Sequence, residues 1–243
     1  MADGKTGGGS ANPSSARNEK PEKVRIGVLG GSFDPIHNGH LHLAREACAR
    51  MPLDQVWFMP ANQSPHKGNP AEANEKDRLA MVQLAISGAG NLQACDLEIQ
   101  RGGRSYTVDT LEELSAAHPE VEWFWLLGLD AFLDFPAWKN PRRLLELAHI
   151  LVAVRPGYDW PQAQKTLQTL HQQTALDYRP APGEKGIREL AAAAGGGRIY
   201  FLDIPPRDIA SRSIRRAIRE GADVKKVLPP EVVQYMMSHR LYA

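Results

Sequence analysis

Short apolar runs alternate along this chain with segments whose apolar residues recur every three or four positions. The runs predict strands, which lie at residues 24–29, 55–59, 92–99, 121–127, 149–154 and 198–204. The segments between them predict helices around residues 44–51, from about 75 to 86, around 111–114, from 140 to about 148, and at 211–220 and 230–239. Continuous apolar runs are typical of strands buried on both faces. This order predicts an α/β fold, a doubly wound and mostly parallel sheet with helices on both sides.

Two regions depart from this alternation. Residues 1–22 are poor in apolar side chains and rich in glycine, serine and proline, so we expect a disordered tail before a domain at residues 23–243. Residues 159–197 hold glutamines, prolines and a low-complexity alanine–glycine stretch, and they predict one weak helix among mobile loops. Near the helix at 111–114, Thr110 and Glu113 have the spacing of a capping-box pair.

Composition narrows the class of protein. The 243 residues carry a formal net charge of +1, so no overall field favours nucleic acid or a lipid surface as a partner. The two cysteines, Cys48 and Cys95, have no C-x-x-C spacing and are expected to be buried thiols in a reducing compartment. No apolar run is long enough for a transmembrane helix, and the N-terminus lacks the apolar core of a signal peptide. We therefore expect a cytoplasmic protein that binds neither nucleic acid nor membrane.

The candidate chemistry gathers in loops that follow the predicted strands, where open parallel sheets bind ligands. The loop at 30–40 begins with two glycines and leads into a helix, a geometry that presents backbone N–H groups to a phosphate. His37 and His40 lie three residues apart at the start of that helix, so both rings can address one ligand. Imidazole N–H groups can donate to phosphate oxygens as negative charge develops on them.

The residues of this loop carry a resemblance to a known family. Residues 31–40, Gly-Ser-Phe-Asp-Pro-Ile-His-Asn-Gly-His, resemble the H-x-G-H signature of the nucleotidyltransferase superfamily. Within it, the chain is similar to bacterial nicotinate-nucleotide adenylyltransferases from about residue 24 to 242; the matching segments are 65–67, Arg78, 105–111, 128–130, 135–138 and 155–158. The resemblance implies a Rossmann-like nucleotidyltransferase fold. It also implies adenylyl transfer from ATP to nicotinate mononucleotide, which forms deamido-NAD and pyrophosphate in NAD biosynthesis.

The resemblance further implies an ATP half of the site. His37 and His40 would hold the ATP phosphates while charge moves onto pyrophosphate. Gly31, Ser32 and Phe33 would offer backbone contacts to the nucleotide. Mg²⁺ is expected to arrive with ATP, held mostly by phosphates and water, so no residue of the chain is predicted as a metal ligand.

A second group of matching residues would bind nicotinate mononucleotide. Trp138 would stack on the pyridine ring, because an indole offers a large flat surface at low entropic cost. Tyr106 and Thr107 would bring polar groups and backbone N–H to the nicotinate carboxylate. Asp130 would bind a ribose hydroxyl or shape its loop, and Arg155 is either a phosphate ligand or a surface residue at a strand exit.

The substrate phosphate would meet His66 and Lys67 in the loop after the second strand. Lysine stands there where the family often has arginine. A point charge then replaces a two-pronged guanidinium, which loosens orientation more than attraction.

The family's second signature, I-S-x-T-x-x-R, is less regular here. Residues 209–216 read Ile-Ala-Ser-Arg-Ser-Ile-Arg-Arg. Alignment on Ile209 puts Arg215 at the arginine position, whereas a shift of one residue fits both serines and Arg216. We prefer the first register because it keeps Ile214 at a core position of the helix. This register puts Ala210 and Arg212 at the Ser and Thr positions, so which serine contacts ATP stays open; the residues assigned to ATP are Ile209, Ser211 and Arg215.

Other functions fit parts of the pattern. A sibling adenylyltransferase could act on nicotinamide mononucleotide or phosphopantetheine. The altered second signature would also suit a nucleotide-binding regulator that has lost catalysis. A class I aminoacyl-tRNA synthetase carries an H-x-G-H-type motif, but this chain is short and has neither an added anticodon domain nor a basic face.

Overall fold

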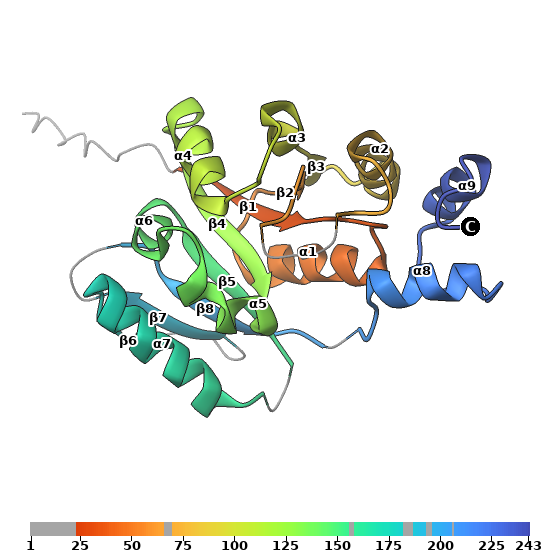
Figure 1. Cartoon of the computed structure of the whole chain (residues 1–243). Coiled ribbons are helices and arrows are strands. Elements are labelled where there is room, and N and C mark those ends of the chain that lie inside the picture. The colour runs from red at the N-terminus through yellow and green to blue at the C-terminus, as the bar shows by residue number, and fades with distance from the viewer. Residues whose placement is uncertain (1–22, 66–69, 156–157, 182–186, 193–195, 206) are drawn as a thin grey trace, which may run out of the picture.

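The apolar runs form one eight-stranded sheet in the computed structural model (Figure 1), which describes residues 23–65, 70–155, 158–181, 187–192, 196–205 and 207–243. The strand order is β3-β2-β1-β4-β5-β8-β7-β6. The strands are β1 (Val24–Gly31), β2 (Gln55–Pro60), β3 (Leu92–Ala94), β4 (Val121–Gly128), β5 (His149–Val154), β6 (Tyr178–Ala181), β7 (Ile187–Ala192) and β8 (Ile199–Asp203). β1 to β5 and β8 pair in parallel, whereas β6 and β7 are antiparallel additions at one edge. The predicted doubly wound, mostly parallel sheet is confirmed.

Helices cover both faces of this sheet (Figure 1). They are α1 (Asn38–Arg50), α2 (Glu75–Ala85), α3 (Leu97–Arg101), α4 (Thr107–Ala117), α5 (Leu129–Leu133), the 3₁₀ helix η1 (Phe135–Ala137), α6 (Pro141–Leu147), α7 (Trp160–Thr174), α8 (Ser211–Arg219) and α9 (Pro230–Ser238). Alternate residues of β4 show the two layers: Trp123 and Trp125 pack with α4 to α7, and Phe124 packs with α1, α2, α8 and α9. None of the helices that the structure describes is both long and apolar enough to cross a membrane.

One predicted strand is wrong in its second half. Residues 92–99 were expected to be extended, but β3 ends at Ala94 and the chain turns into α3. The reason is a buried polar pair, in which the hydroxyl of Thr110 donates to the carboxylate of Glu98 at 2.6 Å. The capping-box interpretation of Thr110 and Glu113 is also wrong. Thr110 lies inside α4, and Tyr106 is the N-cap residue of that helix. A short apolar run alone does not distinguish strand from helix.

Residues 159–197 contain more regular structure than the sequence predicts. α7 is a 15-residue helix whose N-cap Asp159 accepts a hydrogen bond from the backbone of Gln162. β6 and β7 then extend the sheet where loops were expected. Widely spaced apolar residues such as Ala163, Leu170 and Leu190 supply the core contacts, and packing against the sheet stabilises segments of weak local propensity. The expected tail at residues 1–22 lies outside the described residues.

Candidate active site

The site is built where β1 and β2 end side by side. Their parallel register pairs Gly30 with Met59 and Gly31 with Pro60, so the loops that follow them start at the same edge of the sheet. Gly30 has to be small because a Cβ atom there would lie 2.7 Å from the buried ring of Trp125. Gly30 and Gly31 both belong to β1, so the turn that was expected at the glycine pair begins only after Gly31.

His37 and His40 lie together at the start of α1. Their ring centroids are 3.7 Å apart with an angle of 17° between the planes, and the backbone N–H of His37 donates to Nδ1 of His40 at 3.2 Å. Gly39 makes room for this arrangement, because a Cβ atom there would lie 2.9 Å from the His37 ring. The predicted placement of both rings on one side of the helix start is confirmed. Phe33 meets the edge of the His40 ring from the loop.

Burial controls the charge of His37. The residue is 5% exposed, and desolvation lowers the pKa of its ring to about 4, so the ring is neutral near neutral pH. Within the described part of the chain, its buried Nδ1 atom has no hydrogen-bond partner. Buried polar atoms without partners are uncommon in folded proteins and often mark functional positions.

Asp34 anchors the histidine loop, a role that the sequence analysis did not assign to it. Its side chain is buried and accepts hydrogen bonds from the backbone N–H groups of Glu72 (2.8 Å) and Ala73 (3.0 Å) and from the hydroxyl of Tyr242 (2.8 Å). The carboxylate therefore ties the loop after β2 to the histidine loop. The sequence signal for this role was a charged residue between the apolar Phe33 and Pro35, because a charge buried with such neighbours needs polar partners.

The second signature faces the same loop. Arg215 donates from Nη1 to the backbone oxygen of Asp34 at 2.7 Å and from Nε to Glu72 at 2.7 Å. The hydroxyl of Ser211 donates to the backbone oxygen of Pro35 at 3.0 Å. α8 thus begins beside the histidine loop, although the two segments lie far apart in the sequence.

The side chains of α8 also distinguish the two registers of this signature. Ile214 is buried in the core, as the preferred register requires, and Ile209 lies next to the position of Gly39. Arg216 points away, is exposed, and pairs with Glu220 one turn later. Arg215 is therefore the arginine of this helix that meets the histidine loop.

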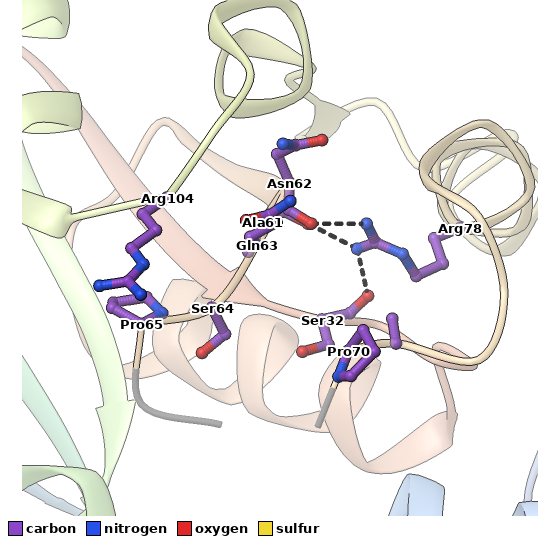
Figure 2. A pocket seen from close by; sticks show the side chains of 10 residues that line it. Ser32, Ala61, Asn62, Gln63, Ser64, Pro65, Pro70, Arg78 and Arg104 are labelled. Carbon is purple, nitrogen blue, oxygen red and sulfur yellow. Dashed lines mark hydrogen bonds between the residues drawn. The ribbon is translucent and has the colours of Figure 1, made fainter. Parts of the chain in front are cut away.

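A pocket lies between the loops after β1 and β2 (Figure 2). Its floor includes Arg78, which is 2% exposed and donates to the backbone oxygens of Ser32 (2.8 Å), Ala61 (2.7 Å) and Asn62 (3.3 Å). Arg78 matched the family pattern but had no assigned role, and the structure shows that it fastens both loops together. The predicted phosphate-binding residues of this loop, His66 and Lys67, lie outside the described residues.

The loop after β2 also contacts the start of α4. The backbone N–H of Asn62 donates to the hydroxyl of Ser105 at 3.0 Å, and the backbone N–H of Ser105 donates to the backbone oxygen of Gln63 at 2.9 Å. Tyr106 and Thr107 follow immediately as the N-cap and first residue of α4. The structure therefore brings these two predicted residues beside the loop that leads to His66 and Lys67.

Trp138 lies just after η1, half-buried against Phe135 with 5.1 Å between the ring centroids. The next residue, Lys139, has its Nζ atom 4.8 Å from the centre of the Tyr106 ring and pairs with Asp109 of α4. This link connects the Trp138 segment to the start of α4, so Trp138, Tyr106 and Thr107 belong to one neighbourhood.

Asp130 and Arg155 follow the adjacent strands β4 and β5. Asp130 folds back toward Gly128, where a Cβ atom would lie 2.6 Å from the carboxylate. Arg155 is exposed and approaches the still more exposed Asp208 at 3.8 Å, a contact that contributes little stability in water. Among the described residues, no group of three or more histidine, cysteine, aspartate or glutamate side chains could hold a metal ion.

Comparisons with known proteins agree with this geometry. Residues 28–217 match the cytidylyltransferase-like family. A protein of Desulfatibacillum aliphaticivorans named a probable nicotinate-nucleotide adenylyltransferase is 40% identical over 220 residues, which are 90% of this chain and 100% of that protein. A Synechococcus protein of the same name is 37% identical over 91% of this chain and 96% of its own length.

A solved structure shows the same fold. The nicotinic acid mononucleotide adenylyltransferase of Plasmodium falciparum, complexed with NaAD, superposes with a TM-score of 0.65 at 19% identity over 90% of this chain and 97% of that one. The family match spans most of the chain. It includes both the histidine loop and the second signature, which contact each other through Ser211 and Arg215. The chain belongs to the nicotinate-nucleotide adenylyltransferases of the cytidylyltransferase-like family.

Proposed function

We propose that this enzyme transfers the adenylyl group of ATP to nicotinate mononucleotide and thereby forms deamido-NAD for NAD biosynthesis. A phosphate oxygen of the mononucleotide attacks the α-phosphorus of ATP, the bond to the β-phosphate oxygen breaks, and pyrophosphate leaves. The observation that carries this proposal is that the loop after β1 holds the stacked His37 and His40 rings and also accepts a hydrogen bond from Arg215 of α8, through the backbone oxygen of Asp34. Such a reaction needs positioning and charge stabilisation more than a covalent partner.

The ATP half of the site is assigned to the loop after β1 and the start of α8. His37 and His40 donate ring N–H groups to phosphate oxygens as charge moves onto pyrophosphate. The backbone N–H groups at the first turn of α8 suit an anion, and Arg215 adds a fixed positive charge beside them. The full set proposed for ATP is Gly31, Ser32, Phe33, His37, His40, Ile209, Ser211 and Arg215.

The acceptor half is assigned to the neighbourhood of Trp138 and the start of α4. Trp138 offers the face of its indole to the pyridine ring, and packing on Phe135 holds the indole in place. The positive end of the α4 dipole favours the nicotinate carboxylate, with Tyr106 and Thr107 at that end. The other residues proposed for this substrate are His66, Lys67, Asp130 and Arg155.

Mg²⁺ is proposed as the companion of ATP, where it would neutralise charge on the phosphates. An ion that accompanies ATP is held mostly by phosphate and water. The free thiols Cys48 and Cys95 are half-buried and suit a reducing compartment, so we place the enzyme in the cytoplasm.

The test is pyrophosphate release from ATP with nicotinate mononucleotide, nicotinamide mononucleotide and phosphopantetheine at equal concentrations. We expect the largest kcat/KM with nicotinate mononucleotide. An equal or larger value with either other acceptor would contradict the assignment. Absence of pyrophosphate release with all three, while ATP still binds, would instead support a non-catalytic regulator.

A further inference from the structure

We propose that Tyr242 is a positioning residue for this reaction, acting through Asp34. The segment after α9 folds back onto the core beneath the histidine loop, and the Tyr242 side chain is 8% exposed there. Its hydroxyl donates to Oδ1 of Asp34 at 2.8 Å, in a buried contact that spans 208 residues of sequence. The kinetic test of this inference rests on the proposed function, whereas the contact between Tyr242 and Asp34 does not depend on that function.

The conformation and chemistry of Tyr242 support a fixed role. Its φ angle is +65°, in the left-handed region that bulky residues rarely occupy. Such a conformation persists only where surrounding contacts enforce it, and it is more common at functional sites. Burial and the neighbouring Asp34 carboxylate hold the pKa of the phenol well above its ordinary value, so the hydroxyl keeps its proton and donates.

Asp34 connects this hydroxyl to the end of the loop after β2 and to α8. Its Oδ1 atom accepts from Ala73 as well as from Tyr242, and its Oδ2 atom accepts from the backbone of Glu72 and lies 3.4 Å from Nη1 of Arg215. The same carboxylate thus orients the loop after β2 and the arginine of α8. If the phenol hydroxyl is removed, the buried carboxylate loses a donor and has to shift toward its remaining partners.

The primary test is Tyr242→Phe, which keeps the ring in the core and removes the hydroxyl. We expect kcat/KM to fall about tenfold for both substrates, as for a lost hydrogen bond to a charged group. We also expect the Kd of a non-hydrolysable ATP analogue to rise several-fold, because Arg215 and the histidine loop lose a common anchor. This binding measurement needs no turnover, so it remains readable even if nicotinate mononucleotide is not the acceptor.

Tyr235→Phe is the matched control. Tyr235 lies in α9, and its hydroxyl donates to Asp77 of α2 at 2.8 Å, away from the histidine loop. This variant loses the same chemical group from the same part of the chain and should keep normal kcat, KM and ATP-analogue binding. A melting temperature lowered in Tyr242→Phe without any change in kinetics or binding would overturn the proposal and leave a purely structural role.

A double-mutant cycle tests whether the effect passes through Asp34. Asp34→Asn weakens the shared acceptor, so adding Tyr242→Phe to it should reduce kcat/KM by much less than tenfold further. Fully additive losses in the double variant would show that Tyr242 acts by another route and would contradict the proposal.

Discussion

The backbone N–H of His37 donates to Nδ1 of His40 while the two imidazole rings stack 3.7 Å apart. Because Nδ1 of His40 accepts this bond, the proton of a neutral His40 ring sits on Nε2. One histidine therefore fixes the tautomer of the other through the helix start. In the proposed reaction, Nε2–H of His40 donates to a phosphate oxygen.

Replacing His40 by alanine removes this donor. We expect kcat to fall by about 100- to 1,000-fold, the usual loss when one charge-stabilising donor is deleted from a reaction centre. The measurement is steady-state pyrophosphate release with nicotinate mononucleotide. His118→Ala is a suitable control, since His118 ends α4 beside Trp57 and takes no part in the histidine loop; its kcat should be unchanged.

The buried ring of His37 predicts a pH effect on stability in the ligand-free protein. Its pKa is about 4 in the folded state and about 6.5 in an unfolded chain, so the unfolded state binds its proton first as the pH falls. The neutral His37 ring stabilises the folded state fully above about pH 6.5. As the pH falls toward about 4, the free energy of unfolding decreases by about 3 kcal/mol in all. Urea unfolding of the unaltered protein and of His37→Asn across this range measures the difference. Parallel pH curves for the two proteins would contradict the prediction.

Arg215 and Arg216 form a matched pair for testing the register of the second signature. Arg215→Lys should lower kcat/KM for ATP by about 10- to 100-fold, because lysine cannot hold the backbone oxygen of Asp34 and the Glu72 carboxylate together. Arg216→Lys should behave like the unaltered protein, since its partner Glu220 is exposed. The opposite ranking would show that the alternative register is correct.

Arg78 should matter for stability rather than for chemistry. Arg78→Met leaves three backbone oxygens without their donor, all in residues that line the pocket in Figure 2, and we expect the free energy of unfolding to fall by at least about 3 kcal/mol. Urea unfolding measures it. Arg104→Met, on the other side of the same pocket and exposed, should change stability by less than about 0.5 kcal/mol.

Trp138→Ala should affect the acceptor and spare ATP. Loss of a stacked ring predicts a KM for nicotinate mononucleotide raised by up to about tenfold, with an unchanged KM for ATP. The two KM values are obtained separately from initial rates, with one substrate varied while the other is kept saturating. Equal changes in both KM values would show that Trp138 supports the fold of the site and does not touch the pyridine ring.

The parts of this fold that follow from local pattern were predictable from the sequence. The strand runs and the helix that begins near residue 140 were visible, and the Asn140 side chain accepts from the backbone N–H of Arg143 at the start of α6. Contacts between distant segments were not predictable. The Glu98–Thr110 pair bends the chain out of β3, and the Asp34–Tyr242 bond joins the two ends of the domain. Both depend on the folded path, because neither partner carries a local signal of the other.

The assignments of both substrates rest on direct adenylyl transfer to the phosphate of nicotinate mononucleotide. To check this step, ATP is supplied with nicotinate mononucleotide whose phosphate oxygens carry a heavy isotope, and the masses of both products are determined by mass spectrometry. Direct transfer keeps all of the label in the dinucleotide and releases unlabelled pyrophosphate in equal amount. Labelled pyrophosphate, or pyrophosphate without dinucleotide, would rule out direct transfer.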